Sequence, residues 1–228
     1  MRAILTALCL LGMASIALAG PAPSGDVPVP AAVPCNLASV VYDWDFTVSD
    51  QGFTTTACDA GGVPVWQYGT TTYVPVAGNC WGTTLATAYP NDAGHGLVSP
   101  MFMVDGCASL LELTHYFDVE GSYDGFNLKV NGTVVTPMGG YTGIINTSTS
   151  YYAWCVDGQT GWHGFGGPRV DCFDLGAFSG QDVTVEIDFG SDSSVTYPGV
   201  YISKIQVGST GASPTESSTW GEIKSLFR

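Results

Sequence analysis

Apolar and polar residues alternate with a period of two over several stretches of the chain. Residues 183–189 read Val-Thr-Val-Glu-Ile-Asp-Phe, which places every second, apolar side chain on one face. Residues 111–119 alternate in the same way. Their expected inward set is Leu111, Leu113, His115, Phe117 and Val119. Such alternation is typical of strands with one buried face, so both stretches are predicted to be β-strands.

Turn residues divide these strands and predict how they connect. Phe126, Leu128 and Val130 alternate up to Asn131-Gly132, a dipeptide typical of a two-residue hairpin turn into residues 133–136. Residues 200–207 form a last β-rich run. Thirty glycines and thirteen prolines separate the strands, and helical periodicity is missing between them. The pattern predicts an all-β fold, an antiparallel jelly-roll β-sandwich.

The two ends of the chain read differently from the middle. Residues 1–19 have a positive start, an apolar run and a small-residue cleavage signal, and are predicted to be a secretory signal peptide. That run is shorter than the roughly 20 residues of a membrane span. Residues 20–34 form a Pro/Ala-rich leader, and residues 35–208 the sandwich domain. A Ser/Thr/Gly linker (209–218) precedes an amphipathic tail (219–228), which is either a frayed end or a tag for export or anchoring machinery.

The charge balance excludes one class of partner. Six Lys and Arg residues stand against twenty Asp and Glu, a formal net charge of −14. Nucleic acid binding needs a basic surface that this composition does not supply. A secreted or cell-surface protein that binds cations, or is kept soluble by its charge, is favoured instead.

The cysteines that remain after removal of Cys9 with the signal peptide form an even set. They are Cys35, Cys58, Cys80, Cys107, Cys155 and Cys172. An even count in an exported chain predicts disulfides, although sequence alone leaves the pairing open. Local spacing favours Cys155 with Cys172, and then Cys35–Cys58 and Cys80–Cys107. No spacing typical of a zinc site is present.

The common catalytic motifs of hydrolases are absent, and one acidic motif remains to be weighed. Neither H-E-x-x-H nor G-x-S-x-G occurs. Glu186-Ile-Asp188-Phe-Gly190 resembles the alternating acids of laminarinase-type glycosidases, in which two carboxylates flank the scissile bond. Gly190 stands where a further acid is needed. Glu186 and Asp188 are therefore either the solvent face of a strand or, in the alternative hypothesis, a catalytic pair.

A cluster of acids in residues 115–130 predicts a cation site. Asp118 and Glu120 share one strand face, and Asp124 lies in the turn that follows. Like charges this close repel one another unless something neutralises them, and no basic residue stands nearby before Lys129. A Ca²⁺ ion accepts such oxygen ligands. The alternative is that the acids point separately into water.

The order of short motifs between Asp43 and Val207 resembles a known family. The motifs are Asp43-Trp-Asp-Phe46, Trp66, 81–85, 97–100, 110–115, 123–125, Trp162, 173–175, 179–181, 189–192 and 199–202. Together they are similar to the MAM-like jelly-roll domains appended to secreted bacterial proteases of the immune inhibitor A type. The resemblance implies a structural calcium ion held by Asp45, Asp118, Glu120 and Asp124. It implies no protease activity, because the protease domain is absent, and Ser203-Lys204 replaces the acidic pair usual after Tyr-Ile.

Aromatic residues in a Gly-rich region predict a ligand surface. Four candidates lie on either side of Cys155: Tyr152 and Trp154 before it, and Trp162 and His163 after it. Aromatic faces on rigid loops stack on sugar rings, although the same tryptophans would also serve as core. We therefore expect a non-catalytic exported binding or adhesion module that recognises carbohydrate or a protein surface. The alternatives are a glycosidase-like enzyme using Glu186 and Asp188, and a structural component of a cell surface or extracellular assembly.

Overall fold

The chain folds into antiparallel β-sheets with almost no helix. The computed structural model describes residues 27–58, 64–147 and 153–211. Of the described residues, 46% lie in strands and 2% in helix, and the helical part includes the short 3-10 turn η2 (Gly176–Phe178). The predicted all-β, antiparallel class is confirmed. The predicted signal peptide (1–19) and tail (219–228) lie outside the described residues.

The larger sheet is built around its longest strand, β15. Its hydrogen-bonded order is β12 (Phe165–Asp174), β7 (Leu110–Asp118), β15 (Gly199–Ser209), β4 (Asn79–Thr83) and β3 (Trp66–Thr70). A sixth strand, β1 (Ser39–Asp45), also pairs with β15. Since β1 pairs with residues 204–209 and β4 with residues 201–202, the two strands share one edge of β15 end to end.

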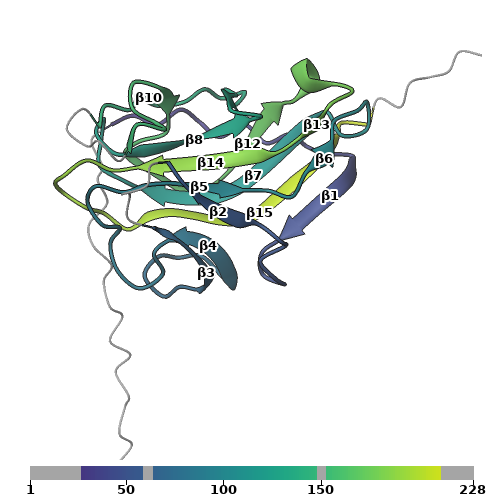
Figure 1. Cartoon of the computed structure of the whole chain (residues 1–228). Coiled ribbons are helices and arrows are strands. Elements are labelled where there is room, and N and C mark those ends of the chain that lie inside the picture. The colour runs from purple at the N-terminus through teal and green to yellow at the C-terminus, as the bar shows by residue number, and fades with distance from the viewer. Residues whose placement is uncertain (1–26, 59–63, 148–152, 212–228) are drawn as a thin grey trace, which may run out of the picture.

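The second sheet carries most of the residues discussed below. Its order is β2 (Thr54–Ala57), β5 (Gly94–Val98), β14 (Val185–Gly190), β8 (Gly125–Val130) and β9 (Thr133–Val134). Two short ladders complete the fold. They are β6 (Phe102–Met103) with β13 (Asp182–Val183), and β10 (Gly143–Ile144) with β11 (Thr160–Gly161). In Figure 1 the β3–β4 hairpin and β10 lie on opposite sides of the molecule.

A single large apolar core lies between the sheets. The inward set predicted for residues 111–119 is buried throughout, and His115, the most accessible of the five, is 3% exposed. Phe117 on β7 meets Phe126 on β8 with ring centroids 5.2 Å apart, which joins the two layers. The period of two therefore predicted the buried face correctly.

The predicted hairpin turn is also confirmed. Asn131 and Gly132 connect β8 to β9 with φ values of 48° and 78°. Positive φ at both central positions is the geometry of a type I′ turn, which Asn-Gly adopts with little strain. The return strand is shorter than predicted, because regular pairing ends at Val134 rather than at residue 136.

The three local cysteine pairings are wrong. The disulfides are Cys35–Cys172 and Cys58–Cys155, with sequence separations of 137 and 97. Cys80 is buried and Cys107 exposed, and both are free thiols. Antiparallel pairing brings distant segments side by side, so nearness in sequence is a poor guide to which thiols meet. Cys155 and Cys172 each bond a cysteine from the N-terminal part of the chain instead.

The described end of the predicted leader, residues 27–34, packs against the domain. The N–H of Cys172 on β12 donates to the carbonyl of Val33 at 2.8 Å, and the Cys172 carbonyl accepts from the N–H of Met138 at 2.8 Å. Arg169 Nη1 donates to the carbonyl of Pro30 at 3.1 Å. The outer edge of β12 is thus covered around Cys172. None of the helices in the part of the chain that the structure describes has the length and hydropathy of a membrane span.

Candidate functional site

Three carboxylates from distant parts of the chain converge at one end of the second sheet. Glu120 and Asp124 lie in the turn between β7 and β8, and Asp192 follows the end of β14. Because Gly125 pairs with Gly190, the start of β8 lies beside the end of β14. One oxygen atom from each acid lies within 4.8 Å of the others.

Hydrogen bonds hold the central acid, Asp124, in place. Tyr89 Oη donates to Asp124 Oδ2 at 2.6 Å, and the backbone N–H of Asp192 donates to Asp124 Oδ1 at 2.7 Å. The N–H of Glu120 donates in turn to Tyr89 Oη at 3.0 Å. Asp124 and Tyr89 are both buried, so the arrangement is part of the packed structure.

Burial and mutual repulsion favour the protonated forms of Glu120 and Asp124 in this cluster. Burial raises the pKa of Asp124 to about 8, against the opposing hydrogen bonds from Tyr89 and Asp192. The pKa of Glu120 is also raised, first by burial and then by the charge of Asp192. Glu120 Oε2 is buried without a hydrogen-bond partner among the described residues. Three converging carboxylates are a suitable oxygen donor set for Ca²⁺.

Two of the acids predicted as metal ligands lie elsewhere. Asp118, at the end of β7, is buried and pairs in the ladder with Gly199. Its charge raises the pKa of Tyr116, after the larger effect of burial, which places it toward Tyr116 and not in the converging set. Asp45 pairs with Lys204, five residues along β15 from Gly199. At about 3.3 Å per residue, the backbones of Asp45 and Asp118 are therefore roughly 16 Å apart along the strand direction. The converging set therefore consists of Glu120, Asp124 and Asp192, and neither Asp45 nor Asp118 belongs to it.

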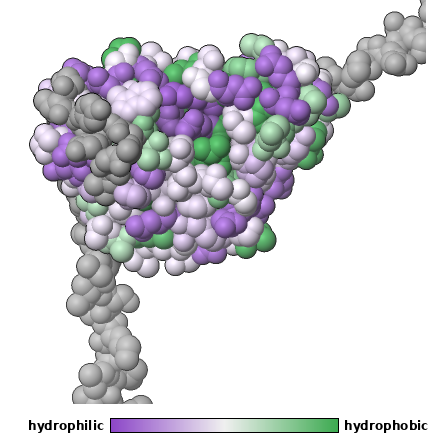
Figure 2. Space-filling view, in the orientation of Figure 1, coloured by the Kyte–Doolittle hydropathy of each residue, from purple (hydrophilic) through white to green (hydrophobic). Residues whose placement is uncertain are grey.

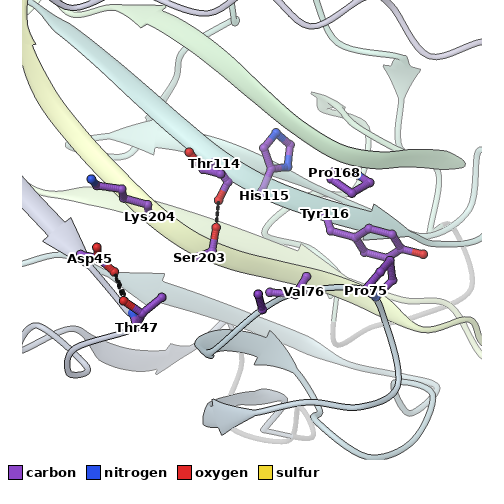
Figure 3. Close-up of a pocket in the computed structure, with 11 residues that line it drawn as sticks. Asp45, Thr47, Pro75, Val76, Thr114, His115, Tyr116, Pro168, Ser203 and Lys204 are labelled. Atoms are coloured by element: carbon purple, nitrogen blue, oxygen red, sulfur yellow. Dashed lines mark hydrogen bonds between the residues drawn. The ribbon is translucent and has the colours of Figure 1, made fainter.

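Asp45 lies instead in a groove on the larger sheet (Figure 3). Its Oδ1 accepts from the hydroxyl and the N–H of Thr47 at 2.5 and 2.9 Å, and these bonds lower the pKa of Asp45. The groove has a volume of about 290 Å³, and apolar Pro75 and Val76 form part of its wall. Figure 3 shows the His115 ring pointing away from the groove, which agrees with its burial in the core.

A second cavity, of about 260 Å³, opens on the outer face of the second sheet. We call it the Trp154 cleft. The residues of its wall that concern us are Cys58, Lys129, Trp154, Cys155, Glu186 and Asp188. Trp154 is 60% exposed, the most exposed aromatic side chain among the described residues. The face in Figure 2 is mainly polar or intermediate, and its hydrophobic residues form small separate groups.

An ionic cluster forms the polar wall of the Trp154 cleft. Lys129 Nζ donates to Asp188 Oδ2 and to the carbonyl of Cys155, each at 2.6 Å. Glu186 lies two residues before Asp188 on β14, and oxygen atoms of both carboxyl groups lie beside Gly96 of β5. Burial, and then the charge of Asp188, raises the pKa of Glu186 to about 7. Glu186 is therefore partly protonated at neutral pH.

The other predicted ligand-binding residues take different positions. Trp162 is fully buried and packs edge-to-face against Tyr141 at a centroid distance of 4.8 Å. It is core and cannot face a ligand. His163 is 4% exposed, and its Nδ1 accepts from the N–H of Ser122 at 3.1 Å. Tyr152 lies outside the described residues. Trp154 alone of the described aromatic candidates faces a cavity.

A buried polar triad, which sequence reasoning did not anticipate, links β7 to β12. Asp171 accepts from His115 Nε2 at 2.8 Å and from Arg169 through Nη2 at 2.7 Å, and Arg169 Nε contacts it as well. Burial raises the pKa of Asp171, but the hydrogen bonds from Arg169 and His115 outweigh it and keep that pKa below its usual value. All three residues are buried between the layers, so we assign them a structural role.

The comparisons with known proteins leave the family open. No family model matches the chain, and no curated protein matches it. The resemblance to MAM-like domains therefore stays a prediction.

Two charged residues of these sites could not be assigned from the sequence. Asp192 and Lys129 are brought beside the acids by long-range strand pairing. Only the register of β8 against β14 could have indicated them.

Proposed function

We propose that this protein is a secreted, non-catalytic module that binds carbohydrate in the Trp154 cleft and carries one structural Ca²⁺ ion. The observation behind this proposal is the exposed Trp154 beside hydrogen-bonding groups in one cavity. An aromatic plane with a few fixed polar groups is the usual composition of a sugar site. On the face shown in Figure 2, the hydrophobic residues form small separate groups and no broad apolar patch.

The polar groups of the cleft are firmly held, as recognition requires. Lys129 is fixed between Asp188 and the carbonyl of Cys155, and Cys155 is joined to Cys58. A site whose side chains are already ordered loses less conformational entropy on binding. The two disulfides also fit an exported protein, because such bonds persist in oxidising compartments.

The arrangement of Glu186 and Asp188 argues for binding rather than glycoside hydrolysis. The carboxyl groups of a glycosidase stand about 5 Å or more apart, on either side of the bond to be broken. Here the two groups lie on one face of β14, and both approach the same residue, Gly96, on the neighbouring strand. Asp188 is also neutralised by Lys129 at 2.6 Å, which leaves it poorly suited to act as a nucleophile.

The proposed calcium ion would bind Glu120, Asp124 and Asp192. Its role would be to neutralise three converging acids and to join the β7–β8 turn to the end of β14. The wider assignment, a MAM-like jelly roll, is supported by two facing antiparallel sheets with many connections between distant strands. It is a proposal about ancestry and carries no activity.

A glycan array followed by calorimetry tests the function. Wild-type protein is expected to bind at least one class of glycan. Trp154→Ala should abolish that binding, whereas Phe165→Ala, an exposed aromatic residue on β12, should leave it unchanged. Absence of any glycan ligand, or binding that survives Trp154→Ala, would overturn the proposal. A protein ligand captured in the same cleft would replace carbohydrate by adhesion to a protein surface.

A further inference from the structure

The Trp154 cleft holds an acidic pair with one more negative charge than its lysine can balance. We infer that the cleft selects an amino sugar with a free primary amine, whose ammonium group binds between Glu186, Asp188 and the face of Trp154. This inference rests on the proposed function and specifies its ligand.

The two carboxyl groups lie close together over Gly96 of the neighbouring strand β5. A Cβ added to Gly96, which lies beside Asp188 in the sheet, would come closer than 3.0 Å to oxygen atoms of both Glu186 and Asp188. Asp188 is 2% exposed, and its Oδ1 is buried with no hydrogen-bond partner among the described residues. A protonated Glu186, or a cation in its place, satisfies this atom.

Among the residues that neighbour the pair in the sheet, Lys129 alone is charged. Strand β8 contributes Lys129 and the neutral Asn127, which pair with Glu186 and Asp188 in the ladder. The paired residues of β5 are Gly96 and Val98, and β2 adds the hydroxyl of Thr56. None of these three is charged. Two carboxylates and one ammonium therefore leave one negative charge when Glu186 is ionised, which a single ligand cation neutralises.

Trp154 makes a sugar amine a better occupant than a metal ion. An ammonium group close to an indole face gains a cation–π attraction, which is larger for tryptophan than for the other aromatic residues. The sugar ring that carries the amine can stack on the remainder of the same face. A hard metal cation would instead require several oxygen ligands, and Asp188 Oδ2 already accepts a hydrogen bond from Lys129.

Binding of the ammonium group should release a proton. Burial keeps the pKa of Glu186 at about 7, so below that pH the pair holds one proton. The positive charge of the incoming ammonium group favours the ionised form of Glu186, whose proton passes to water. Neutral sugars leave that proton in place, and their binding should not be linked to its release.

The experiment compares two trisaccharides that differ only in N-acetylation, β-1,4-linked glucosamine and its fully N-acetylated form. At about 0.15 M salt, which screens the general attraction of an acidic protein for a cation, we expect the amine form to bind at least about tenfold more tightly. Calorimetry at about pH 6 in buffers of different ionisation enthalpy should show close to one proton released per site.

Variants separate this inference from the proposed function. Glu186→Gln mimics the protonated acid and should remove the preference for the amine while binding of the acetylated form persists. Asp43→Asn, an equal change of charge on the exposed strand β1, should leave the preference intact. Equal affinity for both trisaccharides, or a preference unaffected by Glu186→Gln, would reject the amine inference and leave the proposed function standing. Failure to bind either sugar, together with any other glycan, would reject both.

Discussion

His115 and Asp171 are hydrogen-bonded at 2.8 Å inside the apolar core, and Arg169 contacts the same carboxylate. Arg169 also lies over the rings of Phe117 and Trp162 at 5.7 and 5.4 Å. A buried ion pair contributes little net stability, because both charges lose their hydration, but removal of one partner strands the other in the core.

The buried triad should therefore respond asymmetrically to mutation. Asp171→Asn is expected to lower the free energy of unfolding by about 3–5 kcal/mol, because it leaves the Arg169 charge without a counter-ion. Replacing both residues with apolar side chains of similar volume, as in Arg169→Met with Asp171→Leu, should recover most of this loss. Urea unfolding of both variants provides the measurement. Equal losses in the two would show that the charge itself is not what the core depends on.

Calcium should stabilise the protein through the converging acids. If the ion binds only the folded state, a concentration 100-fold above Kd should add about 2.7 kcal/mol to the free energy of unfolding. Thermal melting in EDTA and in added CaCl₂ measures the effect. Asp192→Asn should abolish it and Asp45→Asn should not, since Asp45 bonds to Thr47 in a separate groove. Identical melting temperatures in both media would exclude a stabilising ion.

Stability without divalent cations should fall as the pH rises. The pKa of Asp124 is about 8 in the folded state, against an ordinary value of 3.8. Because the folded protein holds this proton more tightly than the unfolded chain, the stabilisation is complete below the ordinary value and is lost as the pH rises toward 8. Glu186 acts in the same direction. The pKa of His115 is lowered by burial, so His115 destabilises the fold as the pH falls.

Unfolding in EDTA at several pH values tests this linkage. Asp124→Asn should flatten the dependence between about pH 5 and pH 8, and added calcium should flatten it in the wild type by favouring the ionised acid. Equal pH dependence in the wild type and in Asp124→Asn would contradict the charge state that the structure implies for Asp124.

The four disulfide cysteines and the two free cysteines should differ in reactivity and importance. Replacing both Cys35 and Cys172 with serine is expected to cost about 2–5 kcal/mol, as is typical of a long closed loop. A thiol reagent should modify Cys107 in the native protein and Cys80 only after unfolding, because Cys80 is buried and its pKa is raised to about 11 by that burial. Mass spectrometry after alkylation reads both sites. Protection of Cys107 would indicate a third disulfide.

Trp154 and Trp162 should give opposite results on truncation. Trp162→Ala is expected to lower the free energy of unfolding by about 3–5 kcal/mol, since its ring fills the core. Trp154→Ala should change that free energy by less than about 0.5 kcal/mol. Denaturant unfolding of the two variants makes the comparison. A large loss in Trp154→Ala would mean that this side chain supports the fold rather than a ligand.

The strands could be predicted from sequence wherever alternation was clean, as in β7, β14 and the β8–β9 hairpin. Strand β12 could not, because it begins Phe165-Gly-Gly-Pro and turns Arg169 and Asp171 toward the core. Polar residues in buried positions interrupt the alternation on which prediction depends. The triad that satisfies them was visible only once β12 was paired with β7.

The acid cluster was predicted in part. Glu120 and Asp124 are near in sequence and close in space, whereas Asp192 joins them across 68 residues through its N–H bond to Asp124. Asp45 was predicted from the resemblance alone, and the register of β1 on β15 places it far from the other acids. The cysteine pairing was missed for the same reason: contacts between distant strands depend on topology, which local spacing does not reveal.

The way residues 30–33 lie along β12 has a consequence for the protein in concentrated solution. An unpaired outer strand is a template onto which another chain can add, and repeated addition leads to aggregation. Here the chain occupies part of that template itself, and the bond from Cys35 to Cys172 prevents the cover from lifting away. Under reducing conditions the edge of β12 could become exposed again, so the disulfide also protects the protein against aggregation.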